Sequence, residues 1–140
     1  MLQSSYRIRK RIRLGLLLLG LPQLAIGLYA LFFSRDFYRD FPFGRSWAAL
    51  GPFNEHLVTD VGALFCAMGV IALFGVLHVD RRLSQAVSFG WIVFTVPHLV
   101  FHANHRAGLE TVDVIAQMAV FVAQLLIALY VLSASRRLKA

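Results

Sequence analysis

The chain has 140 residues, of which 59% are hydrophobic and only 15% are charged, yet its formal net charge is +7. Soluble domains carry about 25% charged residues, so a soluble nucleic-acid-binding domain fits the charge but not the apolar content. The hydrophobicity excludes a disordered chain, and a single cysteine, Cys66, excludes a disulfide scaffold. These numbers predict a small integral membrane protein with one domain over residues 1–140.

Four apolar segments are long enough to cross a membrane as helices. A run of about 20 residues spans about 30 Å, the thickness of the hydrocarbon core. The predicted spans cover residues 14–33, 57–77, 84–103 and 112–132. The first run follows basic residues, as in a signal peptide, but it is longer than the apolar part of one and no small-x-small cleavage site follows it. The predicted fold class is therefore all-α, a four-span transmembrane helix bundle.

The loop between the first two predicted spans, residues 34–54, contains an Arg-Asp-Phe triplet twice, four residues apart. On a helix this spacing places Phe37 and Phe41 on one face. Ser34 is the expected N-cap, because a serine side chain can accept a hydrogen bond from an amide of the first turn. We expect a short interfacial helix here, with Trp47 and Phe53 as aromatic anchors, and a lid over a polar site is the alternative.

Lys and Arg are distributed unevenly between the two predicted sides of the membrane. Ten of the 14 lie on the side that holds both termini and the loop between the second and third spans. These are Arg7, Arg9, Lys10, Arg11, Arg13, Arg81, Arg82, Arg136, Arg137 and Lys139. Because basic loops stay in the cytoplasm, we expect a protein of the inner (plasma) membrane with both termini cytoplasmic.

Acidic residues and histidines gather on the opposite, outer side. Six of the seven Asp and Glu residues and four of the five histidines lie there. Membrane orientation does not require this arrangement, since acidic residues contribute little to it. Ionisable groups in membrane segments are a functional-site hypothesis by default, so we expect a site at the outer end of the bundle.

Helical spacing places these polar residues in stripes on three of the predicted spans. His98, His102 and His105 are spaced i, i+4, i+7 and lie within an arc of about 60°. His56 and Asp60 are one turn apart on the second span. The other members are Glu110, Asp113, Gln117 and Gln124 on the fourth span, Trp91 and Thr95 on the third, and Glu55 beside the second. Lipid cannot satisfy such groups, so we expect all three stripes to face inward.

This combination of residue types is typical of a metal site. Imidazoles one turn apart can bind one ion, and carboxylates from neighbouring helices can complete its coordination or act as a general base. The predicted ligands are His98, His102, His105, His56, Asp60, Glu110 and Asp113, supported by Glu55, Gln117, Trp91 and Thr95. The ion would be a transition metal, zinc or iron. A proton relay, a ligand pocket and a structural hydrogen-bond network are the alternatives.

Two segments carry a resemblance to known proteins. Residues 54–63 read NEHLVTDVGA and residues 97–105 read PHLVFHANH. Together they resemble a group of small bacterial four-helix integral membrane proteins, which implies this architecture and no activity. The HxxxH of His98 and His102 is also similar to one box of the membrane di-iron desaturases, which use more histidines than the five present here. With His56 and Asp60 it is similar to the site of membrane zinc hydrolases of the ceramidase and adiponectin-receptor kind, which have more helices.

The sequence therefore predicts an integral membrane protein with a metal- or proton-active polar site at the outer end of the bundle. The alternatives are a non-enzymatic subunit, a carrier of a small molecule, quinone or lipid headgroup, or an assembly partner of a larger membrane complex. The expected partners are the lipid bilayer and other membrane subunits or further copies of the chain, and not nucleic acid. No phosphate-binding loop, GxSxG or CxxC motif occurs.

Overall fold

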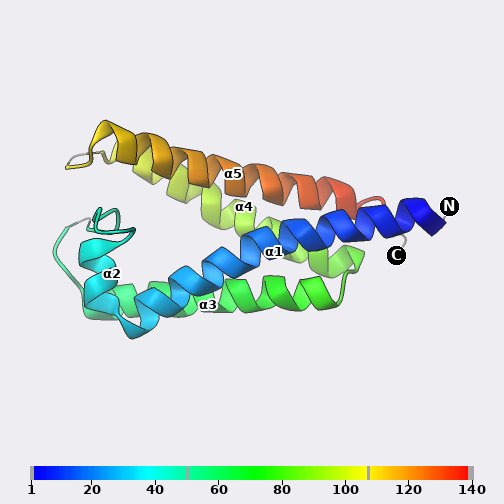
Figure 1. The fold of residues 1–140 in the computed structure, drawn as a ribbon, viewed down its shortest axis with the longest axis horizontal. Coiled ribbons are helices and arrows are strands. Elements are labelled where there is room, and N and C mark those ends of the chain that lie inside the picture. Colours follow the sequence, from blue (N-terminus) through cyan, green and yellow to red (C-terminus); the bar gives the residue numbers. More distant parts are fainter. Residues whose placement is uncertain (1, 50, 107, 139–140) are drawn as a thin grey trace.

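The computed structural model describes residues 2–49, 51–106 and 108–138, and within these ranges the chain is all-helical without strands (Figure 1). The helices are α1 (Leu2–Phe32), α2 (Ser34–Asp40), α3 (Glu55–Leu77), α4 (Arg81–Asn104) and α5 (Thr111–Ser135). The all-α class is therefore confirmed, and all helices but α2 are long and apolar enough to cross a membrane, which indicates a multi-pass membrane protein. Lys139, counted above among the basic residues, lies outside the described residues.

The first helix is longer than the predicted span, which started at residue 14. It begins at Leu2 and runs through the basic segment without interruption. Arginine, lysine and leucine are all good helix formers, so nothing in this segment ends the helix. The apolar run therefore marks only the part of α1 that fits the hydrocarbon core.

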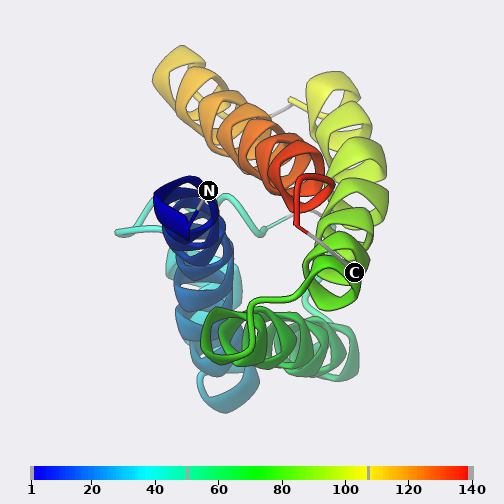
Figure 2. The ribbon, with the colours of Figure 1, turned by 90° about the vertical axis from the view of Figure 1, so that its right-hand side faces the viewer.

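The four long helices form two antiparallel pairs. α1 packs mainly against α3, and α4 packs mainly against α5. Seen from the end where the chain terminates, they surround a common interior in the order α1, α3, α4, α5 (Figure 2). The pairs approach each other near the termini and diverge toward α2 (Figure 1). We call these the termini end and the α2 end.

The pair α1–α3 is held together by close backbone contact at glycines. A Cβ atom added to Gly27 would lie 2.7 Å from the backbone nitrogen of Cys66, and one added to Gly62 would lie 2.6 Å from that of Leu31. No side chain fits at these distances, so only glycine permits the approach. These contacts also fix the rotation of α3 about its axis, and hence the face that it turns inward.

The apolar core fills the interior toward the termini end. It includes Ile12, Leu16 and Leu19 of α1, Val87 and Trp91 of α4, and Ala128 and Val131 of α5. Large apolar side chains such as Leu14, Val93 and Leu126 are instead exposed on the outer surface of the four long helices. An apolar exterior of this kind is what a lipid environment requires.

The segment that follows α1 folds across the α2 end (Figure 1). Phe37 and Phe41 lie on one face as predicted, with their rings stacked at 4.7 Å between centroids. The predicted N-cap is wrong, because Ser34 is already the first residue of α2 and Phe33 occupies the cap position without a side-chain hydrogen bond. The amide of Phe33 still donates to Tyr29 of α1 at 2.9 Å, so the chain leaves the helix too briefly to need a polar cap.

Candidate functional site

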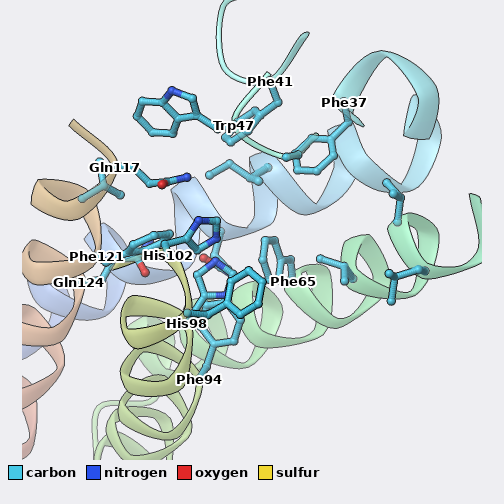
Figure 3. A pocket seen from close by; sticks show the side chains of 18 residues that line it. Phe37, Phe41, Trp47, Phe65, Phe94, His98, His102, Gln117, Phe121 and Gln124 are labelled. Carbon is cyan, nitrogen blue, oxygen red and sulfur yellow. The ribbon is translucent and has the colours of Figure 1, made fainter. Parts of the chain in front are cut away.

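A cavity of about 440 Å³ lies between the two helix pairs where they diverge. This volume is within the range of about 300–1,000 Å³ that is usual for small-molecule sites. Phe37, Phe41 and Trp47 cover it from the α2 end, while Phe65, Phe94 and Phe121 line it from three of the long helices (Figure 3). The walls are therefore mainly aromatic and apolar.

Two of the three predicted histidines on α4 lie together in this cavity. The ring centroids of His98 and His102 are 4.6 Å apart. Phe121 of α5 contacts both rings, with its ring centroid 4.7 Å from that of His98 and 5.3 Å from that of His102. The ring centroid of Phe94 lies 4.9 Å from that of His98. The inward direction of the α4 stripe is thus confirmed for these two imidazoles, which Figure 3 shows side by side.

Three glutamines from two other helices complete the polar lining of the cavity. Gln117 and Gln124 come from α5, and Gln23 comes from α1. Within the described part of the chain, Oε1 of Gln117, Oε1 of Gln124, Nε2 of Gln23 and Nδ1 of His102 are buried without a hydrogen-bond partner. A buried polar group left in this state costs about 1–3 kcal/mol, so these atoms are available to a molecule inside the cavity.

Sequence reasoning missed Gln23. The available signal was its position as the only amide side chain in the apolar run of residues 14–33. A polar side chain in such a run has to face the protein interior, because lipid offers it no hydrogen bond. Helical periodicity could not have revealed it, since the positions one and two turns away from Gln23 in this apolar run carry no polar side chain.

The cavity lining carries no fixed charge among the described residues. Its polar members are the two imidazoles, the three glutamine amides and the indole of Trp47, and no Asp, Glu, Lys or Arg side chain lines it. A charged ligand would therefore be buried without a counter-charge, at high cost. The lining matches a neutral molecule that is mostly apolar and carries hydrogen-bonding groups.

The other predicted ligands lie outside the cavity. His105 is exposed just beyond α4, where its ring stacks on Phe101 at 4.0 Å. His56 and Asp60 form a pair at 3.4 Å on the outer surface of α3, with 87% and 63% of their side chains exposed. Glu55 is exposed as well. Among the described residues, no group of three or more His, Cys, Asp or Glu is placed to hold a metal ion.

The expected inward direction of the α3 stripe is therefore wrong. The face of α3 that carries Gly62 is buried against α1. At 3.6 residues per turn, Asp60 lies about 160° around the helix from Gly62. The close glycine contact thus turns Asp60 and its neighbour His56 away from the interior.

Asp113 binds two residues of the loop that covers the cavity. Its carboxylate, only 7% exposed, accepts hydrogen bonds from Nε1 of Trp47 at 2.9 Å and from Nη2 of Arg45 at 3.1 Å. Nε of Arg45 donates to the same carboxylate. The hydrogen bond to Asp113, and next the negative charge of Asp113, raise the pKa of Arg45. Glu110 lies 3.4 Å from the same guanidinium but is 80% exposed.

This polar contact joins the two helix pairs at the α2 end. Arg45 and Trp47 belong to the segment that follows α1 and α2, whereas Asp113 belongs to α5. Sequence reasoning counted Arg45 only toward topology and treated Trp47 as an interfacial anchor. Arg45 and Trp47 are 68 and 66 positions from Asp113 in the sequence, so helical periodicity does not relate them. Only the tertiary structure shows that they are in contact.

Trp91 and Thr95 continue the α4 stripe below the cavity, toward the termini end. Both side chains are buried, as expected for an inward stripe. Nε1 of Trp91 and Oγ1 of Thr95 also have no hydrogen-bond partner in the described ranges. They do not line the cavity itself.

No family model, no curated protein and no solved structure matches this chain. The resemblance to small bacterial four-helix membrane proteins stays a prediction.

Proposed function

We propose that the chain crosses the plasma membrane as a four-helix bundle, with α2 in the outer interface and both termini in the cytoplasm, and that its cavity binds a neutral lipophilic compound of the quinone type. The observation that carries the proposal is the uncharged aromatic cavity with unpaired polar atoms. The distribution of Lys and Arg supports the orientation.

The aromatic walls favour a planar ring. Phe94, Phe121 and the two histidines present ring faces or edges to the cavity, and aromatic rings gain from offset or edge-to-face contact. A flexible alkyl or isoprenoid tail fits the remaining apolar surface and continues into lipid.

The unpaired atoms favour ring oxygens as hydrogen-bond partners. Nε2 of Gln23 can donate to a carbonyl, whereas Oε1 of Gln117 and Oε1 of Gln124 can accept from a hydroxyl. The cavity therefore offers partners to a quinone, which only accepts, and to a quinol, which also donates. A phosphate or carboxylate head would find no cation there, which argues against a charged lipid headgroup.

Binding can be measured by quenching of Trp47, which lines the cavity. In a Trp91→Phe background, Trp47 is the single tryptophan, and quinones quench tryptophan fluorescence on contact. A decyl-substituted benzoquinone is expected to quench saturably, whereas decanoate and decyl phosphate are expected not to compete. Gln23→Leu is expected to weaken binding of the quinone about tenfold, because it removes the Nε2 group that can donate a hydrogen bond to a quinone carbonyl in a dry site.

Gln85→Leu serves as the matched control, since Gln85 lies on α4 outside the cavity. Non-saturable quenching, or equal loss in both glutamine variants, would refute the proposed site. Metal analysis of the same preparation tests the second candidate, a transition metal on His98 and His102, whose adjacent rings supply two imidazole ligands. Stoichiometric zinc or iron that is lost in the His98→Ala/His102→Ala variant would favour the metal over the quinone.

A further inference from the structure

The lining of the cavity reaches the outer surface of the protein on α3 and on α4. Leu57 of α3 is 60% exposed and Phe101 of α4 is 46% exposed, although both line the cavity. Around α3, Leu57 lies between Val61, which also lines the cavity, and the exposed Asp60. The lining therefore continues to the outside at this edge of α3.

The same arrangement is found on α4. Around this helix, Phe101 lies between His98, which lines the cavity, and Pro97, which is exposed. Moreover, α3 and α4 contact each other less than α1 and α5 do. The gap between α3 and α4 is thus the looser of the two joints between the helix pairs.

A contact between two aromatic rings closes this gap farther from the α2 end. Phe65 of α3 and Phe94 of α4 meet edge to face, with 5.3 Å between their ring centroids. Leu57 precedes Phe65 by eight residues and Phe101 follows Phe94 by seven, which is about two turns in each helix. At 1.5 Å per residue, the gap extends about 10–12 Å from the aromatic contact toward the α2 end.

The opposite gap, between α1 and α5, is better closed. Val120 of α5 lines the cavity and is 45% exposed, but neither Gln23 nor Ile26, which line it from α1, is exposed. The covering loop also bridges the two helix pairs here, because Trp47 donates to Asp113 of α5. Exposed lining residues therefore stand on both sides of the gap between α3 and α4, but on one side of the gap between α1 and α5.

The polar groups of the cavity lie away from the gap between α3 and α4. The residues that α3 contributes to the lining are all apolar, namely Leu57, Val58, Val61 and Phe65. The glutamines belong to α1 and α5 instead, and Figure 3 shows Gln117 and Gln124 on the side of α5. A molecule with oxygens at one end and hydrocarbon at the other therefore fits in one direction.

We propose that the cavity opens sideways between α3 and α4, and that this opening holds the hydrocarbon tail of the bound compound while its ring lies toward Gln117 and Gln124. Leu57 and Phe101 both belong to helices that can span a membrane, so the tail continues into lipid. The substrate class is then a long-tailed quinone that resides in the membrane. The assignment of the tail rests on the proposed function, because it requires the ring in the cavity.

A reversible block of the opening tests the proposal. Leu57→Cys, in a Cys66→Ala/Trp91→Phe background and reconstituted in nanodiscs, is modified with benzyl methanethiosulfonate, which attaches a benzylthio group at the opening. Quenching of Trp47 then measures binding of a decyl-substituted benzoquinone and of the same ring without the tail. We expect binding of the decyl compound to weaken about tenfold and binding of the tail-less ring to change less than about twofold, because only the tail needs the opening. Reduction of the mixed disulfide should restore binding.

Val120→Cys is the matched control, since Val120 is a similarly exposed lining residue on α5. Its modification is expected to change the binding of both compounds by the same factor. A selective loss of the decyl compound in modified Val120→Cys, or equal effects on both compounds in modified Leu57→Cys, would overturn the opening between α3 and α4.

Phe101→Cys covers the event that Leu57→Cys does not fold, since it places the same block on the other side of the opening and is expected to respond in the same way. Saturable quenching that ignores the block at both positions would overturn the opening and leave the proposed function standing. Non-saturable quenching by both compounds in the unmodified protein would instead refute the proposed function, and the assignment of the tail with it.

Discussion

Replacing Asp113 by asparagine is expected to release the loop that covers the cavity. The carboxylate of Asp113 accepts from Trp47 and from two nitrogens of Arg45. Asparagine keeps one oxygen, but its amide nitrogen is a donor and cannot accept from the guanidinium. One oxygen then remains for the three donors, Nε1 of Trp47 and two nitrogens of Arg45. At least one hydrogen bond from Arg45 is therefore lost, together with the negative charge that attracts it.

The size of the effect follows from the burial of the two partners. A hydrogen bond to a charged group contributes about 1.5–3 kcal/mol when it is buried. The Asp113 side chain is 7% exposed, but Arg45 is 41% exposed, so solvent screening reduces the loss toward the lower part of this range. About 2 kcal/mol corresponds to a roughly thirtyfold increase in the open population of the loop.

The fluorescence of Trp47 reports this opening in a Trp91→Phe background. In Asp113→Asn we expect the emission to shift to longer wavelength and quenching by acrylamide to increase, because Trp47 leaves the cavity for water. Glu110→Gln is the matched control, since Glu110 lies beside the same guanidinium but is 80% exposed, and it is expected to leave both signals unchanged. Unchanged Trp47 signals in Asp113→Asn, or equal shifts in both variants, would refute the role assigned to Asp113.

Three further outcomes are expected for variants in other parts of the protein. Gly62→Ala should destabilise the protein by about 1–3 kcal/mol in detergent unfolding, because the added methyl group meets the backbone of α1. Gly90→Ala, with open space around the added Cβ atom, should instead stabilise α4 by up to about 1 kcal/mol, and a loss in both variants would contradict this reasoning. His56→Ala should leave quinone quenching and stability within about 0.5 kcal/mol of wild type, since its side chain is exposed. Any zinc or iron that co-purifies should depend on His98 and His102 and survive His56→Ala, and metal lost with His56 would place the site on the outer surface of α3.

Part of the site was predictable because one helix generates it. His98, His102, Trp91 and Thr95 share a face of α4 through spacing alone, and their need for partners in lipid sends that face inward. The same logic failed for His56 and Asp60 on α3, where a closer interaction, the glycine contact with α1, sets the rotation of the helix. Periodicity shows which residues share a face, but competition between faces decides which one is buried.

The sequence by itself determined the four apolar helices, their approximate limits and the side on which acidic residues and histidines gather. Each of these follows from local composition and from the thickness of a bilayer. Only the tertiary structure decided that the helix pairs diverge to enclose a cavity, that Gln23 faces it, and that Asp113 binds Arg45 and Trp47. These features depend on contacts between residues far apart in the chain, whose packing no periodic pattern encodes.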